Sequence, residues 1–487
     1  MTKKPLNQAQ SLKSDSKRLQ TAGLAIAAFL IIANGFAIIR EFTYIPMITV
    51  GIVGGYIVLF HTNIALCLTA FCTPLSVIFS SKDIHLGLSL PSEALMISLT
   101  ILFFVRILYD LQIRKDYVRH PISIAIFIYL GWMLVTCFTS ARPIVSFKYF
   151  ASKIWFVTCC YWMFMQLADD GWKKIVWYFD SYAAGLVVVV LVTTVKHALS
   201  GFDEHYAHWV MSPFYNDHTA YGAALAFMIP ITVGFAFLEG MKPPRRVFYV
   251  LVSAVLLTGF YLSFSRAAWL SLAAAIAVFI ILKLRIKLSW IVGFGAIFGI
   301  VMLFYADDIL YRMSRNSQDS SGNFVEHIQS MSNISTDASN MERINRWTAA
   351  FGMIKERPVF GWGPGTYQFE YASFQQAKYQ TVISTDFGDG GNAHSEYINP
   401  CAESGIPGML TVFALLVCVI FCGIKTYIHS NDRNGRTLSL VMTLSLVTYF
   451  THGVFNNFLD TDKLSLLFWS AFAVIMVCNV KYRKETV

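Results

Sequence analysis

The sequence is poor in charged residues. Only 14% of its 487 residues are Asp, Glu, Lys or Arg, whereas soluble domains average about 25%. By contrast, 56% of the residues are hydrophobic. Apolar runs of roughly 18 or more residues recur along nearly the whole chain, and each is long enough to cross a bilayer as a helix. The composition therefore excludes an ordinary soluble enzyme and indicates a membrane protein that crosses the bilayer many times.

The sequence also lacks the common metal and nucleotide motifs. Its nine cysteines form no CxxC pair and no zinc-like spacing with histidine. The glycine-rich stretch "FGWGPGTY" (360–367) lacks a GK[ST] ending, and Pro364 removes an amide donor. We therefore predict a tight turn there rather than a phosphate loop. Neither a cofactor nor a metal ion is expected.

The formal net charge of +9 does not indicate a nucleic-acid partner. Lys and Arg lie mostly in short loops between apolar runs, which is the pattern that retains loops in the cytoplasm. No basic patch is interleaved with stacking aromatic residues on a soluble domain. The expected environment is instead a lipid bilayer.

The apolar runs predict an all-α polytopic membrane protein with about 12 to 14 transmembrane helices. The candidate spans are residues 20–39, 44–60, 62–80, 93–111, 121–139, 149–167, 175–196, 218–238, 246–264, 266–283, 287–306, 401–424, 437–452 and 464–480. Very short turns between some neighbours leave the count open. We expect a transmembrane bundle of about 11 spans over residues 1–306, a loop domain over 307–400 and about three spans over 401–487.

Loop charges predict the orientation of these spans. The N-terminal segment and the loops at 114–120, 239–246 and 425–436 carry basic residues, whereas the loop at 81–93 is poorer in them. The positive-inside rule then places both termini in the cytoplasm.

The same orientation places three polar segments outside the cytoplasm, in the periplasm of a Gram-negative cell. They are the loop 197–217, the corner Ser263–Arg266 and the segment 307–400, which we expect to be mostly helical. Residues 341–356 read as an amphipathic helix. Its apolar face is predicted to consist of Met341, Ile344, Trp347, Phe351 and Ile354.

His394 is the first candidate for chemistry. It precedes a long apolar run, with Glu396 and Glu403 close by in the sequence. A histidine at the mouth of a membrane helix can act as a general base. The alternative is a histidine that merely hydrogen-bonds a loop, and the two carboxylates are either orienters of the histidine or cap residues.

Arg266 stands between two long apolar runs. A charge there is costly and usually has a partner, although it can also snorkel to the interface. The planar guanidinium suits recognition of a phosphate, to which Ser265 adds a hydroxyl donor. Arg343 and Arg346 lie one helical turn apart, so one helix face can carry both. Either they line the same anionic site, or they belong to a solvated face.

Asn216 and His218 lie just before another apolar run. The simple interpretation is a helix cap formed by Asn216 or Asp217. Their position on the same side of the membrane as Arg266 makes them supporting candidates for an anionic site.

Three stretches, "SFSRAAW", "ERINRWTAAFGMIKERPVFGWGPGTY" and "NAHSEYINPCAESGIPGML", occur in this order around one extracytoplasmic loop. Together they resemble the O-antigen ligase and Wzy polymerase superfamily, over roughly residues 205–425. The resemblance implies a GT-C-like, metal-independent, inverting glycosyltransferase of the bacterial inner membrane. Its donor would be a glycan on undecaprenyl pyrophosphate, and its active site would face the periplasm.

The resemblance also implies roles for particular residues. Arg266 matches the arginine that would bind the donor pyrophosphate, and His394 matches the histidine that would activate the acceptor hydroxyl. The family often has an arginine shortly before its "PFxN" segment, where His208 and Trp209 stand here. Another arginine, or in part His205 or His208, would have to supply that charge.

The acceptor stays open. Lipid A–core, as in an O-antigen ligase, is the leading prediction; a growing glycan, as in a polymerase, or a protein hydroxyl, as in a protein O-oligosaccharyltransferase, are the alternatives. A transporter of lipid-linked glycan is the alternative from a different class, and it would show charged or broken helices at mid-membrane and internal repeats. The ionisable residues here gather at the outer face, which favours transfer chemistry.

Overall fold

The structure, a computed structural model, describes residues 44–81, 86–109, 113–286, 338–380, 384 and 391–482. The predicted spans 20–39 and 287–306 and most of both terminal segments lie outside these residues. The chain divides into two compact units, Met1–Ala65 and Leu66–Val487. In the first, α2 (Tyr44–Phe60) agrees with the predicted span 44–60.

The described residues are almost entirely helical. After α2 the elements are α3 (Thr62–Leu75), β1 (Val77–Ser81), β2 (Leu86–Leu90), α4 (Ser92–Tyr109), α5 (Lys115–Val118), α6 (Pro121–Phe138), α7 (Pro143–Val157), the π-helix η1 (Thr158–Met163), α8 (Phe164–Asp169), α9 (Trp172–Leu199), α10 (Glu204–Ala207), α11 (His218–Phe235), α12 (Pro243–Tyr261), α13 (Arg266–Lys283), α17 (Ala338–Glu356), α18 (Tyr367–Glu370), the 3₁₀ turns η2 (Tyr371–Phe374) and η3 (Ala377–Tyr379), α19 (Ile398–His429), α20 (Arg433–His452) and α21 (Asp462–Lys481).

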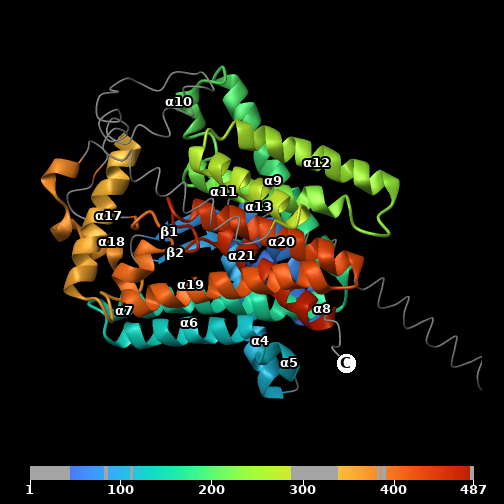
Figure 1. Cartoon of the computed structure of the whole chain (residues 1–487), viewed down its shortest axis with the longest axis horizontal. Coiled ribbons are helices and arrows are strands. Elements are labelled where there is room, and N and C mark those ends of the chain that lie inside the picture. Colours follow the sequence, from blue (N-terminus) through green and yellow to red (C-terminus); the bar gives the residue numbers. More distant parts are fainter. Residues whose placement is uncertain are drawn as a thin grey trace, which may run out of the picture. The chain divides into compact units, whose positions relative to one another are not determined.

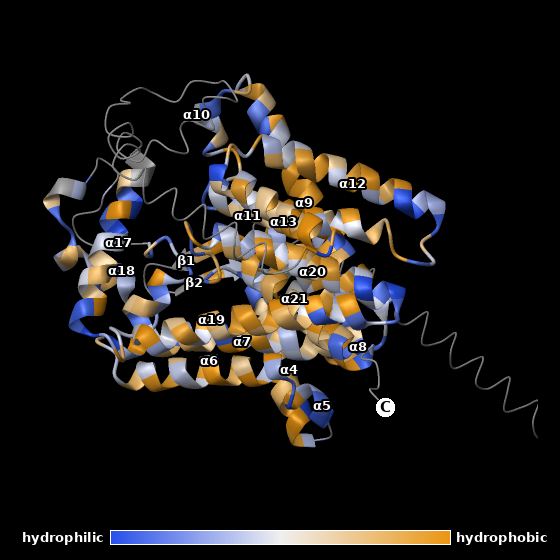
Figure 2. Cartoon of the chain, in the orientation of Figure 1, coloured by the Kyte–Doolittle hydropathy of each residue, from blue (hydrophilic) through white to orange (hydrophobic). Residues whose placement is uncertain are grey.

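Seven of the described helices are long and apolar enough to cross a membrane, judged by length and composition. They are α4, α6, α9, α11, α13, α19 and α21. Figure 2 shows the apolar residues spread along these helices. The prediction of an all-α polytopic membrane protein is confirmed.

The helix α20 is an interior helix of a different kind. It packs against α11, α13, α19 and α21, and Figure 1 shows it between α11 and α13 on one side and α19 on the other. Its buried residues include Ser439, Thr443, Ser445 and Thr448. A helix surrounded by other helices does not need the apolar surface that lipid demands.

One predicted span ends earlier than expected. The run 62–80 forms α3 only as far as Leu75, and the following residues pair as an antiparallel hairpin in which Val77 lies opposite Leu90. Pro74 lies in the last turn of α3. Because proline lacks an amide hydrogen and its ring disturbs the preceding turn, it favours the end of a helix at this point.

The amphipathic helix predicted at 341–356 is present as α17, but its buried face was predicted wrongly. The fully buried residues are Glu342, Asn345, Arg346, Ala349, Ala350 and Met353. Phe351, predicted inside, is 57% exposed. The alanines allow α17 to pack closely against η2 and α19, and the buried arginine and glutamate neutralise each other.

The predicted tight turn is confirmed and is fixed to α19. Gly361, Gly363 and Gly365 all have positive φ angles. The turn bonds to the first part of α19: the Gly363 amide donates to the Glu403 carbonyl at 2.7 Å. Next to this contact α19 is broken at Gly405, which has φ 73° and ψ −179°.

Gly405→Ala is expected to destabilise the protein. Alanine is strained at a positive φ, and its Cβ would lie 2.0 Å from the carbonyl oxygen of Val359. We expect a loss of about 2 kcal/mol or more, measured as a lower unfolding temperature of the full chain in detergent. The control is Gly131→Ala in α6, where a Cβ meets nothing within 4 Å. Equal unfolding temperatures for the two variants would contradict the proposed strain.

Candidate functional site

Three segments that are distant in the sequence meet at one end of the long helices. They are α17, the loop 391–397 that precedes α19, and residues 453–461, here called the α20–α21 connection. Figure 1 shows α17 and α18 at this end, with α5 and α8 toward the opposite end. The three segments therefore form a polar cap on an otherwise apolar bundle.

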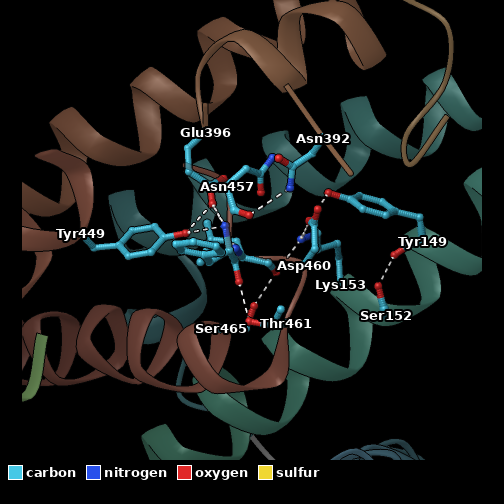
Figure 3. Close-up of polar contacts among 12 residues, drawn as sticks. Tyr149, Ser152, Lys153, Asn392, Glu396, Tyr449, Asn457, Asp460, Thr461 and Ser465 are labelled. Carbon is cyan, nitrogen blue, oxygen red and sulfur yellow. Dashed lines mark hydrogen bonds and ion pairs between the residues drawn. The ribbon is translucent and has the colours of Figure 1, made fainter. Parts of the chain in front are cut away.

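Asn392 ties these segments together. Its side-chain amide donates to the Asn457 carbonyl at 3.0 Å (Figure 3), and its own carbonyl accepts a bond from Arg346 Nη1 at 3.0 Å. Its side-chain oxygen accepts the amide hydrogen of His394 at 3.0 Å. One residue thus fixes the backbone at His394 against α17 and the α20–α21 connection.

His394 is held in an unusual state. It is half-buried, and its φ of 48° lies in the left-handed region that non-glycine residues rarely occupy. Burial, together with the positive charges of Arg346 and Arg343, lowers the pKa of His394 to about 3. The imidazole is therefore neutral at physiological pH and has a ring nitrogen available to accept a proton.

The two arginines of α17 have different partners. Arg346 forms a buried ion pair with Glu342, with an Nε–Oε1 distance of 2.7 Å, and its guanidinium lies 5.2 Å from the centre of the Tyr371 ring. Arg343 is half-buried and donates from Nε to the Phe455 carbonyl at 3.3 Å. Arg346 is thus fixed within the protein, whereas Arg343 bridges α17 to the α20–α21 connection.

A second group of basic residues comes from the segment after α10 and from the starts of α11 and α13. The ring centres of His208 and His218 lie 4.0 Å apart. His218 lies within electrostatic reach of Arg266, Arg343 and His452. Arg343 also acts on His394, so this one arginine of α17 links His394 electrostatically with His218.

Helix caps place two of these residues. Asp217 caps α11 by accepting the amide hydrogen of Ala220 at 2.7 Å, which is one of the two predicted alternatives. Asn216, the other alternative, is exposed. Ser265 caps α13 by accepting the Ala268 amide at 3.4 Å. His218 and Arg266 are consequently the first residues of their helices, where the helix N-termini themselves favour an anion.

Glu396 and Glu403 bind backbone rather than flank His394. Oε1 of Glu396 accepts the hydroxyl of Tyr449 and the amides of Phe458 at 2.8 Å and Leu459 at 3.0 Å (Figure 3). Burial, with the charge of Asp460, raises the pKa of Glu396. Glu403 accepts the Tyr367 amide at 3.1 Å. The two carboxylates fasten the α20–α21 connection and the segment after the glycine turn, and neither of them is the N-cap of α19, which is Tyr397.

The α20–α21 connection was not predicted as part of the site. It contributes contacts to Arg343, Asn392 and Glu396, and buried His452 immediately precedes it. The available signal was the stretch "HGVFNNFLDTDK", which is polar although it joins two apolar runs.

The fold defines a polytopic helical membrane protein, and one end of its bundle carries His394, Arg343 and Arg346. Residues 251–413 match the family described as O-antigen ligase. This segment contains Arg266, Arg343, Arg346 and His394, and the match supports assignment of the chain to the O-antigen ligase and Wzy polymerase superfamily. The resemblance seen in the sequence is thereby confirmed.

A protein of Haemophilus influenzae, described as uncharacterized, is also similar to this chain. The two are 21% identical over 253 residues, which is 52% of this chain and 61% of that protein. The similarity therefore spans less than two thirds of the relative.

Proposed function

We propose that this protein is a glycosyltransferase at the periplasmic face of the bacterial inner membrane. It moves a glycan from undecaprenyl pyrophosphate to an acceptor hydroxyl, with lipid A–core as the leading acceptor. The observation that carries the proposal is the convergence of neutral His394 with Arg343 and the Arg266–His218 group at one end of an apolar bundle. A substrate that is half lipid and half anion suits such a place.

The basic residues would act on the donor. Arg266 and Arg343 would supply positive charge to the pyrophosphate, and the His208–His218 pair would add hydrogen-bond donors, whereas Arg346 is already paired with Glu342. When the sugar–phosphate C–O bond breaks, negative charge grows on the leaving oxygen, and preorganised cations stabilise it. The arginines would supply this positive charge without requiring a metal ion.

His394 would act on the acceptor. The acceptor oxygen attacks the anomeric carbon, its proton passes to a ring nitrogen of His394, and undecaprenyl pyrophosphate leaves with the electron pair of the broken bond. A single displacement of this kind inverts the anomeric centre. The base needs only to reach the attacking hydroxyl.

The charge around His394 predicts an unusual pH profile. Protonation of His394 removes the base, and the pH dependence of kcat/KM reports the pKa of that group in the free enzyme. Because the pKa of His394 is about 3, kcat/KM is expected to stay level as the pH falls from 8 to 5. Bound pyrophosphate offsets Arg343 and Arg346, so the acid limb of kcat is expected at a higher pH than that of kcat/KM. Rate measurements over this range test both statements. A kcat/KM that is half-maximal near pH 6.5 would contradict them.

Reconstitution tests the proposal as a whole. The full chain in proteoliposomes is given an undecaprenyl-pyrophosphate-linked glycan with lipid A–core, with further lipid-linked glycan or with a protein acceptor. Glycan on lipid A–core supports a ligase, an extended lipid-linked glycan a polymerase, and a glycosylated protein an O-oligosaccharyltransferase. Movement of the donor across the membrane without transfer to any acceptor would replace the proposal with the transporter alternative.

A further inference from the structure

A short non-helical segment, residues 358–363, lies against two of the helices that are apolar enough to cross a membrane. It belongs to the connection between α17 and α18. The ring of Phe360 stacks on that of Trp132 in α6, with 5.8 Å between the ring centres and 13° between the ring planes. The Ile406 amide of α19 donates to the Pro358 carbonyl at 2.8 Å. The segment is therefore fixed beside both α6 and α19.

Trp132 lies well inside α6 and not at its end. It precedes Phe138, the last residue of α6, by six residues, which is about 9 Å along the helix axis. The whole of α6 has 18 residues and is about 27 Å long, whereas the hydrocarbon core of a bilayer is about 30 Å thick. If α6 crosses the bilayer, nearly its whole length lies in hydrocarbon, and so does Phe360 beside Trp132.

The exposed side chains of the segment are apolar and continue a stripe on α19. Val359 and Phe360 are 50% and 44% exposed. Exposed apolar residues on α19 recur at the three- and four-residue spacing of one helix face: Ile406, Leu410, Phe413, Val417 and Phe421. On a helix that crosses a membrane, such a stripe faces acyl chains. Because the stripe begins at Ile406, beside the segment, Val359 and Phe360 extend the same lipid-facing surface.

The backbone of the segment meets the requirement that lipid imposes. Non-helical backbone is tolerated at membrane depth only where protein covers it and satisfies its hydrogen bonds. Pro358 has no N–H to satisfy. Three amides of the segment donate to protein carbonyls, at 3.2, 3.1 and 2.7 Å respectively: Gly361 to Arg357, Trp362 to Ala402 and Gly363 to Glu403. All three of these donors are buried.

From these observations we infer that residues 358–363 form a short re-entrant segment. It dips into the leaflet at the cap end of the bundle and exposes Val359 and Phe360 to phospholipid acyl chains. Lys355 and Glu356, the exposed last residues of α17, stay at the level of the headgroups, where charged ends reach water. The polar cap is thereby held on the membrane surface. The inference goes beyond the proposed function and requires neither donor nor acceptor.

The test uses photo-cross-linking of the full chain to lipid. The chain carries p-benzoylphenylalanine at one position and is reconstituted in vesicles of phosphatidylethanolamine and phosphatidylglycerol with radiolabelled acyl chains. No polyprenyl lipid is present, so label can come only from phospholipid. The cross-linker in place of Val359 is expected to give the same labelling of the protein as in place of Phe421, which is 63% exposed on the α19 stripe. In place of Gln376, which is exposed between η2 and η3, it is expected to give only background label.

The comparison of Val359 with Gln376 decides. More label at Val359 than at Gln376 supports the re-entrant segment, whereas label no greater than at Gln376 overturns it. The unfolding temperature of each variant checks its fold. If replacement of Val359 lowers that temperature, Phe360, which is already aromatic, takes its place in the same comparison. The labelling is independent of glycan transfer, so its failure leaves the proposed function standing.

Discussion

Replacing His394 with asparagine is expected to lower kcat for glycan transfer by about 10²–10⁴-fold, the usual contribution of a general base. Asparagine tolerates the φ of 48° at this position. The backbone N–H of residue 394 can keep its hydrogen bond to the side-chain oxygen of Asn392. The loop should therefore retain its shape while losing the imidazole. Initial rates at saturating donor and acceptor, with the unfolding temperature measured in parallel, give the result.

The control for this substitution is His429→Asn. His429 is the last residue of α19, at the opposite end from His394, and it is exposed. Its Nδ1 lies 3.0 Å from the Lys425 carbonyl oxygen, so the variant is expected to transfer at the wild-type rate. If His394→Asn also transfers at that rate, the acceptor hydroxyl is activated by another group, and the base assignment is wrong.

Replacing Arg266 with alanine is expected to reduce kcat/KM for the donor by about 10²–10³-fold, the loss typical when one preorganised donor to a developing anion is removed. Lysine at this position keeps the charge but not the planar fork that binds two phosphate oxygens. We therefore expect only partial rescue by Arg266→Lys. The measurement is the initial rate of transfer as a function of donor concentration, with the acceptor at a saturating concentration.

The lysine variant also distinguishes the two interpretations of Arg266. A residue that merely snorkels to the interface should be replaceable by lysine without loss, so full activity of Arg266→Lys would rule out the pyrophosphate contact. Arg142→Ala is the matched control. Arg142 precedes α7 at the same end of the bundle, where its Nε lies 2.6 Å from Glu370 Oε1, and it has no part in the proposed site.

The long helices were largely predictable because each depends on a local property of the sequence. The spans predicted at 121–139 and 266–283 correspond to α6 and α13 almost to the residue, since proline at the start of α6 and Ser265 at the start of α13 are direct helix signals. The hairpin after α3 was missed because Val77–Ser81 continues the same apolar run.

The buried face of α17 was missed for a related reason. Apolar periodicity selects the largest apolar side chains, whereas α17 buries Ala349, Ala350 and Met353 in an aromatic-rich cluster. Glu342 and Arg346 on the same face are buried because they pair with each other. A hydrophobicity pattern does not reveal a face that contains an ion pair and small residues.

The sequence points to candidate residues for a site but not to the contacts between them. His394, Arg266 and His218 stand out because each is an ionisable residue next to an apolar run. Asn392 and Asn457 are 65 residues apart, and Lys153 and Asp460 are 307 residues apart. Such pairs form only after the helices have packed, so a single sequence carries no local trace of them.

The polar character of α20 bears on how the protein is made. Its buried serines and threonines keep it out of the group of described helices that are apolar enough to cross a membrane by themselves. Within α20, Thr443 donates to the Ser439 carbonyl at 2.7 Å and Thr448 to the Ser445 carbonyl at 2.7 Å, and the packing of α20 against α11, α13, α19 and α21 covers its polar side chains, so we expect its insertion to depend on these neighbours. Because α20 ends at His452 and leads into the connection that binds Arg343, Asn392 and Glu396, the polar cap is completed only when α20 and α21 are in place. A nascent chain truncated before α20 would lack these contacts to α17 and to the loop that carries His394.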